Sequence, residues 1–410
     1  MAKEKKHATS NPAELRKVLR TLGTKKQRHL SPVAWYRHPA GLAVSVYTGA
    51  GCYVFAGQPD AVQAAAGGFL PAVKATTGGR IDAILDARGD VLAAYNAADA
   101  IEDGTIYAKE PTERITPEPE HTAEMAQELL DALPWIIKAT AGSDNSARLI
   151  LQSVAVQLTG YGLRLAGADN YRIHVAGAPA DAPATASVLV WRPAALLLAE
   201  AEAPAIVNYH PHGGAEIIAP GLVLRVKDSA KFPDFAAVIP NDKNMPDDPA
   251  SCYVEADKLR DAVNVASTAA AVQAATTGGS SDGFSALAIG RNGLAVASPA
   301  GKEAATWTNT AGEDTRAVVL PDGRGRYGAG ASTMQSRYAL DALDGFTGEL
   351  VKVNLYPDNK PATFTRTDYA GRCRVAVVMP VRMPDGSPAA EAAKEAAGIA
   401  PVAELEPANA

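Results

Sequence analysis

Three segments of this chain resemble one another, and this internal repetition limits the fold more than any other feature. Each contains a Gly-Leu pair that opens a strand-like stretch, at Gly41, Gly162 and Gly293. The pairs stand 121 and 131 residues apart, which is the length of a whole domain rather than of a solenoid repeat. A helix-like stretch precedes each pair, at residues 13–19, 123–129 and 256–262. The 410 residues are therefore predicted to form three similar domains.

Proline-rich and acidic linkers suggest where these domains end. We expect a basic tail at 1–10, a first domain with its linker at 11–119, a second domain at 120–245, a third at 246–383 and a tail at 384–410. The last segment is poor in large apolar residues, so we expect it to be disordered.

Hydrophobic spacing indicates two helices and roughly eight strands in each domain. The clearest helices are expected at 123–140, 193–202, from about 255 onward, and 336–343. Strands are expected at 151–158, 162–175, 215–226 and 350–378, among others. Helices of this kind against antiparallel sheets predict an α+β fold.

Composition excludes several classes of protein. No run of eighteen apolar residues occurs, and no apolar segment follows the charged residues 1–6, so neither a membrane span nor a signal peptide is predicted. Cys52, Cys252 and Cys373 are widely separated. We expect buried free thiols in a reducing cytoplasm.

Charge is distributed unevenly along the chain. Residues 1–38 hold ten Lys or Arg and two Glu, whereas the remainder carries 29 basic and 43 acidic residues. A basic N-terminal segment followed by an acidic remainder suggests a localised anion-binding face. A basic segment that only improves solubility is the alternative.

No set of residues predicts catalysis. The glycines at 323–330 lack a following Gly-Lys-Ser/Thr, and no Gly-x-Ser-x-Gly occurs. His210 and His212 flank a proline, but no further ligand stands near them, so a polar loop is expected rather than a metal site. We predict no enzyme activity, no cofactor and no metal.

Four motifs, in this order, resemble the bacterial β sliding clamp, the processivity subunit of DNA polymerase III. They are Ala-Asp-Asn-Tyr-Arg-Ile at 168–173, Phe-Pro-Asp-Phe with Val-Ile-Pro at 232–240, Tyr-Ala-Leu-Asp-Ala-Leu at 338–343 and Val-Val-Met-Pro-Val-Arg at 377–382. On pattern alone, the second and fourth could be simple strand ends, since both contain proline. The resemblance covers residues 120–383.

This resemblance implies three clamp-fold domains per chain, each with two helices on an inner wall, that form half of a ring. A homodimer would encircle double-stranded DNA without reading its sequence and would tether the replicative polymerase. The resemblance also implies short peptide motifs as ligands, from the polymerase, the clamp loader and repair proteins. The alternative is a clamp-fold interaction scaffold that no longer encircles DNA.

Two sets of site residues follow from the resemblance. The peptide pocket would lie between the second and third domains and be lined by Leu151, Ala168, Asn170, Tyr171, Arg172, Ile173, Pro240, Gln335, Tyr338, Val377, Met379, Pro380, Val381, Arg382 and Met383. DNA would be contacted by Arg16, Lys17, Arg20, Lys25, Lys26 and Arg28. The family usually has His where Tyr171 stands, so peptide preference is expected to differ.

Overall fold

The three Gly-Leu pairs each begin the second strand of a β-hairpin. In the computed structural model, β1 (Val33–His38) pairs with β2 (Gly41–Thr48), β9 (Ser153–Thr159) with β10 (Gly162–Ala168), and β17 (Phe284–Gly290) with β18 (Gly293–Ala297). Gly162 and Gly293 have φ near +118° and +116°, a conformation that favours glycine. The prediction that each Gly-Leu pair opens a strand is thus confirmed.

The structure describes the following residues: 18, 21, 33–38, 41–48, 52–67, 72–75, 83–85, 91–94, 106–109, 118–142, 149–177, 184–201, 203–211, 213–227, 232–234, 238–240, 249–277, 283–300, 303–308, 314–321, 328–356, 360–367, 373–381 and 387–399. Contacts divide the chain into two compact units: residues 1–167 with 182–232, and 168–181 with 233–410. We refer to them as unit 1 and unit 2. The described elements are mixed helix and antiparallel sheet, so the predicted α+β class is confirmed.

Unit 1 contains one nine-stranded sheet that joins the first two repeats, in the order β7-β4-β1-β2-β3-β15-β14-β13-β8. Its remaining strands are β3 (Cys52–Gly57), β4 (Ala72–Ala75), β7 (Ile106–Lys109), β8 (His121–Met125), β13 (Ala205–Tyr209), β14 (Ala215–Ala219) and β15 (Leu222–Val226). The repeats meet where β3 pairs with β15, at Val54 and Leu224 among others. Helix α2 (Pro59–Gly67) packs on this junction through Val62 and Ala65 against Phe55 and Val223.

The rest of unit 1 is smaller. Strand β12 (Ala184–Trp191) extends the β9–β10 hairpin, and β5 (Ala83–Leu85) pairs with β6 (Val91–Ala94). Helices α4 (Gln127–Lys138) and α5 (Arg192–Leu198) pack together, and a 3-10 turn, η1 (Leu149–Gln152), leads into β9. At Gly167 a Cβ atom would lie 2.4 Å from the carbonyl oxygen of Ile136, so α4 requires glycine at this point of β10.

Three expectations for unit 1 need correction. Residues 121–125 form strand β8 rather than the start of a helix, because they pair with β13, and the helix begins only at Gln127. Leu151 and Gln152 lie in η1 rather than in a strand. The helix expected at 193–202 is shorter, as α5 ends at Leu198. Of the first expected helix, at 13–19, only Val18 is described, and it is helical.

Unit 2 contains two larger sheets, two short strand pairs and three α-helices among its described residues. One sheet runs β11-β27-β26-β25-β16, with β11 (Arg172–Gly177), β27 (Cys373–Val378), β26 (Ala362–Thr367), β25 (Leu350–Leu355) and β16 (Ala250–Glu255). The other runs β23-β18-β17-β24, with β23 (Val318–Leu320) and β24 (Gly330–Gln335). Short strand pairs are β19 (Pro299–Ala300) with β20 (Glu303–Ala304) and β21 (Trp307–Thr308) with β22 (Asp314–Thr315).

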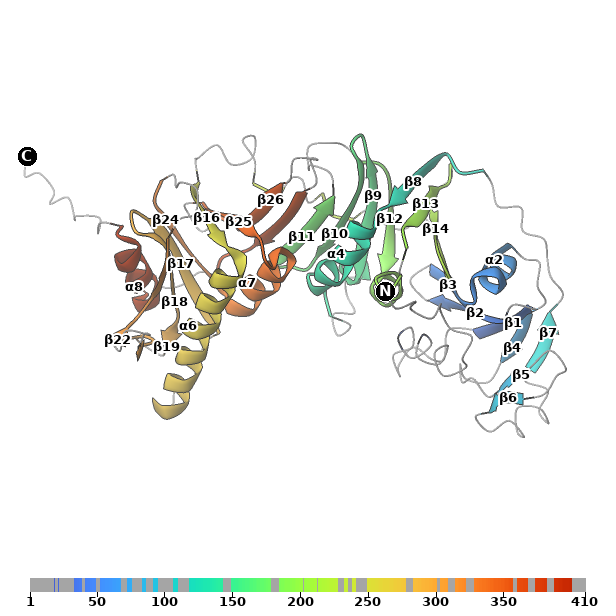
Figure 1. Ribbon diagram of the computed structural model, residues 1–410, viewed down its shortest axis with the longest axis horizontal. Helices are drawn as coiled ribbons and strands as arrows, with labels where there is room; N and C mark the ends of the chain where they lie inside the picture. Colours follow the sequence, from blue (N-terminus) through green and yellow to red (C-terminus); the bar gives the residue numbers. More distant parts are fainter. Residues whose placement is uncertain are drawn as a thin grey trace, which may run out of the picture. The chain divides into compact units, whose positions relative to one another are not determined.

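The β17–β18 sheet is covered on both faces (Figure 1). Helices α6 (Ala256–Thr277) and α7 (Ser336–Leu343), the latter followed by the turn η3 (Asp344–Phe346), pack together and contact these strands. The helices expected from about 255 and at 336–343 are thus confirmed. On the alanine face lies α8 (Pro388–Ala397), whose Ala389, Ala393 and Ala397 are fully buried.

Helix α8 corrects the expectation that 384–410 is disordered, for the residues that form it. The sheet face beneath it is lined by alanines, among them Ala286, Ala288, Ala295 and Ala297. Because both partners are small, an alanine helix can pack closely without any large apolar residue. The last turn is held by Asn292, whose backbone N–H donates to Ala397 O at 2.9 Å and whose side chain donates to Ala396 O at 2.9 Å.

The cysteine prediction is confirmed, since Cys52, Cys252 and Cys373 are all buried free thiols. Burial raises the pKa of the Cys52 thiol to about 12. None of the helices in the described ranges is both long and apolar enough to cross a membrane.

Candidate peptide site

The candidate site begins at the turn between β10 and β11. The Asp169 carboxylate accepts hydrogen bonds from the backbone N–H groups of Tyr171 and Arg172, at 2.7 and 3.0 Å. The Asp169 N–H donates to the Arg172 carbonyl at 3.1 Å. Such a turn, built by an aspartate on its own backbone, fixes the direction of the two side chains that follow.

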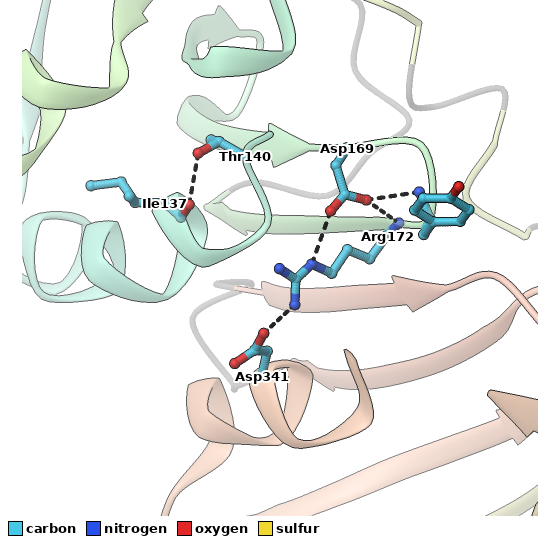
Figure 2. Close-up of polar contacts among 6 residues, drawn as sticks. Ile137, Thr140, Asp169, Arg172 and Asp341 are labelled. Atoms are coloured by element: carbon cyan, nitrogen blue, oxygen red, sulfur yellow. Dashed lines mark hydrogen bonds and ion pairs between the residues drawn. The ribbon is translucent and has the colours of Figure 1, made fainter. Parts of the chain in front are cut away.

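Arg172 is the centre of an ion-pair network within unit 2. Its guanidinium contacts the carboxylate of Asp169, with Nε 3.3 Å from Oδ2, and its Nη1 donates to Asp341 of α7 (Figure 2). The Arg172 side chain is only 7% exposed. A cation this deeply buried is stable only when it is paired, so both carboxylates are required for its position.

Two tyrosines cover this network. The Tyr338 ring lies 4.5 Å from the Arg172 Cζ atom and stacks on Tyr171 at 5.8 Å between centroids, with 19° between the planes. Tyr338 is buried, whereas Tyr171 is 54% exposed. The pair therefore presents one aromatic face to solvent above a fixed cation.

The end of β27 borders the exposed tyrosine. Residues Arg172 and Ile173 of β11 pair with Val378 and Val377 of β27, and the N–H of Met379 donates to the Tyr171 carbonyl at 2.8 Å. Met379 is 37% exposed. Methionine is flexible and polarisable, so it suits a surface that adapts to different apolar ligands.

The structure brings together six of the residues expected in the pocket: Tyr171, Arg172, Ile173, Tyr338, Val377 and Met379. Ile173 and Val377 are buried, so only Tyr171 and Met379 expose large apolar surface among these six. Val381 is tied to Thr333 by a 2.8 Å backbone hydrogen bond, Gln335 precedes α7, and Pro240 and Pro380 are half-buried. Ala168 is buried and Asn170 is exposed.

The other expected site residues are not brought to this cluster by the described contacts. Leu151 is buried and belongs to unit 1. Arg382 and Met383 lie outside the described residues, as do all six residues expected to contact DNA, Arg16, Lys17, Arg20, Lys25, Lys26 and Arg28. His212 and the glycines at 323 and 325 lie outside them too. Within the described ranges, no three His, Cys, Asp or Glu side chains come close enough to hold a metal ion.

Sequence reasoning did not select two residues of the network, Asp169 and Asp341. Asp169 could have been found, because an aspartate side chain commonly accepts a hydrogen bond from the backbone two residues later and so builds such a turn. Asp341 could not, since it stands 169 positions from its partner Arg172.

Solved structures with the same architecture include the sliding clamp (DNA polymerase III subunit beta) of Pseudomonas aeruginosa, bound to griselimycin. Its TM-score is 0.57, with 16% sequence identity over 90% of this chain and 97% of that one. The chain has the fold of the bacterial sliding clamps. The Helicobacter pylori beta clamp gives a TM-score of 0.59 at 12% identity, covering 92% and 99% of the two chains.

The DNA polymerase III beta subunit of Thermotoga maritima shares the clamp fold as well, with a TM-score of 0.55 and 16% identity over 90% of this chain and 96% of that one. No family model matches the sequence, and no curated protein matches it. The likeness is therefore one of structure, and the resemblance predicted from four motifs is confirmed at the level of the fold.

Proposed function

We propose that this protein is a DNA sliding clamp, a ring-shaped homodimer that encircles duplex DNA and tethers a DNA polymerase without catalysing any reaction. The observation that supports this most is the clamp fold along 90% of the chain, which accounts for 97% of the Pseudomonas aeruginosa clamp. A ring that surrounds DNA keeps the bound polymerase close to the template, because the ring must open before it can leave the DNA. It raises the effective concentration of a bound polymerase without holding any base.

Ring closure is tested by the mass in solution. Three clamp domains per chain cover half of a ring, so a cyclic dimer of 42.5 kDa subunits is expected. Light scattering across a range of micromolar concentrations measures this. A constant mass equal to one chain would exclude the ring.

Topological binding is tested with nicked circular DNA and a clamp loader. A loaded ring stays bound to circular DNA and dissociates when the DNA is linearised by a cut at one site. A protein that binds only to the surface of DNA stays bound equally well to circular and to linear DNA. Direct affinity should fall with salt and depend on the proposed contacts of the first repeat. If reversing the charge of Arg20 and Lys25 together leaves loading and direct binding unchanged, these two residues do not contact DNA.

A second function, a clamp-fold scaffold that does not encircle DNA, is favoured by one specific observation. Helices α4, α5, α6 and α7 together carry five acidic and five basic residues, so they offer duplex DNA no net positive charge. The two functions give opposite results in the circle experiment. Retention that survives linearisation, or no retention at all, supports the scaffold.

Partner binding is proposed for the site around Tyr171 and Met379, with peptides from the polymerase, the clamp loader and repair proteins as ligands. Apolar anchors of such a peptide typically contribute about 2 kcal/mol or more each. Met379→Ala with Tyr171→Ala should abolish polymerase stimulation and leave the dimer mass unchanged, because both side chains are exposed. A double variant that keeps its Tm, its mass and its polymerase binding would exclude these residues from the site.

A further inference from the structure

Arg337 is an exposed cation at the edge of the candidate peptide site. It is the second residue of α7, and its guanidinium Cζ lies 5.1 Å from the ring centroid of Tyr338. The same ring stacks on Tyr171, the exposed aromatic of the site. One buried tyrosine therefore connects an apolar platform to a positive charge.

The carboxylate that would ordinarily neutralise Arg337 is engaged elsewhere. Asp341 stands four positions later on the same face of α7, where an i,i+4 ion pair with Arg337 would form. In the structure Asp341 instead binds Arg172. In the described part of the chain, no carboxylate lies within ion-pair distance of Arg337.

The two arginines therefore have different roles. Arg172 is buried between two carboxylates, which makes it a fixed part of the site and leaves it little charge to offer a ligand. Arg337 is exposed, and its guanidinium lies over an aromatic ring. Because this contact already restricts the side chain, less conformational entropy is lost when a ligand binds to it.

We propose that Arg337 is a specificity residue that selects partner peptides with an acidic side chain close to their apolar anchor. This rests on the proposed peptide site around Tyr171 and Met379. The Arg337 guanidinium and the Tyr171 ring both lie at known distances from the ring centroid of Tyr338. A peptide segment of roughly three extended residues is therefore long enough to reach from the Tyr171 ring to the guanidinium. The carboxylate is thus expected within about three residues of the leucine or phenylalanine that packs on Tyr171.

The experiment uses the full chain and a set of fluorescein-labelled nonapeptides. Each peptide carries the same leucine and phenylalanine, with a single aspartate moved along the other positions, and each has an asparagine counterpart of equal size. Fluorescence anisotropy gives the affinity of each pair at low and at 0.5 M salt. The variants are Arg337→Gln, Arg337→Lys and Arg337→Glu, and Arg316→Gln removes another exposed arginine of unit 2 as the matched control.

At one or two positions the aspartate peptide should bind about two- to fivefold more tightly than its asparagine counterpart, as expected for an exposed ion pair. High salt should remove the difference. Arg337→Gln should remove it too, Arg337→Lys should keep part of it, and Arg337→Glu should reverse it, whereas Arg316→Gln changes nothing.

Two failures remain distinguishable. If no peptide binds the unmodified protein, the proposed peptide site itself is wrong. If peptides bind but no position favours aspartate, or if the preference survives Arg337→Gln, the site stands and the role of Arg337 is refuted. A thermal melt of each variant separates a loss of recognition from a loss of folding.

Discussion

Gly290→Ala should loosen the C-terminal helix α8 from its sheet. A Cβ atom at Gly290 would lie 2.5 Å from the Ala397 carbonyl oxygen and 2.9 Å from a side-chain carbon of Ile399. Gly290 has no positive φ, so alanine is conformationally permitted there and the clash is the main effect. Relief of this clash requires the last turn of α8 to move.

The expected loss is about 1–3 kcal/mol, the range for an added methyl group in a packed core. This loss has an upper limit, because α8 can detach from the sheet when the strain of keeping it packed exceeds the stabilisation that its packing provides. The three buried methyl groups of α8, on Ala389, Ala393 and Ala397, contribute roughly 2–3 kcal/mol by their burial. The free energy lost by the Gly290→Ala substitution is therefore comparable to the free energy that the burial of these three methyl groups contributes.

A double-mutant cycle measures the effect by urea unfolding. Gly290→Ala is made in the full chain and in a chain that ends at Gly386, before α8, and Gly160→Ala is the control because nothing lies within 4 Å of its Cβ position. The substitution should destabilise only the full chain and should speed tryptic cleavage after Lys394. Equal effects in both backgrounds, or unchanged cleavage, would refute the packing argument.

Two further predictions concern buried ionisable groups. Arg172→Gln leaves two half-buried carboxylates without their cation and should cost about 2–3 kcal/mol in urea unfolding, whereas Lys258→Gln, at an exposed pair, should stay within about 0.5 kcal/mol. Burial raises the pKa of Cys52 from 9.0 to about 12, so the unfolded chain ionises first as pH rises. The stability that this thiol contributes is complete below pH 9 and should fall by about 1.4 kcal/mol per pH unit between pH 9 and 12. The free energy of unfolding, measured at pH 8.5, 9.5 and 10.5, should fall less steeply with pH for Cys52→Ala than for the unmodified protein. Burial also raises the pKa of Tyr209, so this tyrosine adds a loss of stability of the same sign, and the Cys52→Ala variant keeps that loss.

Local patterns predicted the elements that are built from local signals. The Gly-Leu hairpins need only a two-residue turn with glycine after it, and α7 has an apolar face at helical spacing. By contrast, residues 121–125 have no strong strand signal and become β8 because β13 lies beside them. Pairing with a strand some eighty residues later cannot be deduced from the segment alone.

Helix α8 failed to appear in the sequence reasoning for a related reason. Its alanines look too small to pack, and they are sufficient only because β17 and β18 present alanine to them. The site shows the same limit. Arg172 and Tyr338 were predicted from motif resemblance, but the partnership of Arg172 with Asp341 depends on how β11 and α7 meet, which no short motif encodes.

The β3–β15 junction has a consequence for how this protein is made. Val54 pairs with Leu224, so the first repeat finishes its sheet only with strands that are synthesised about 170 residues later. Synthesis proceeds at roughly 5–20 residues per second, so the edge of β3 stays unpaired for on the order of 10–30 s before β15 has been synthesised. An unpaired edge is a template for aggregation, so the newborn first repeat should need a chaperone that the finished chain does not.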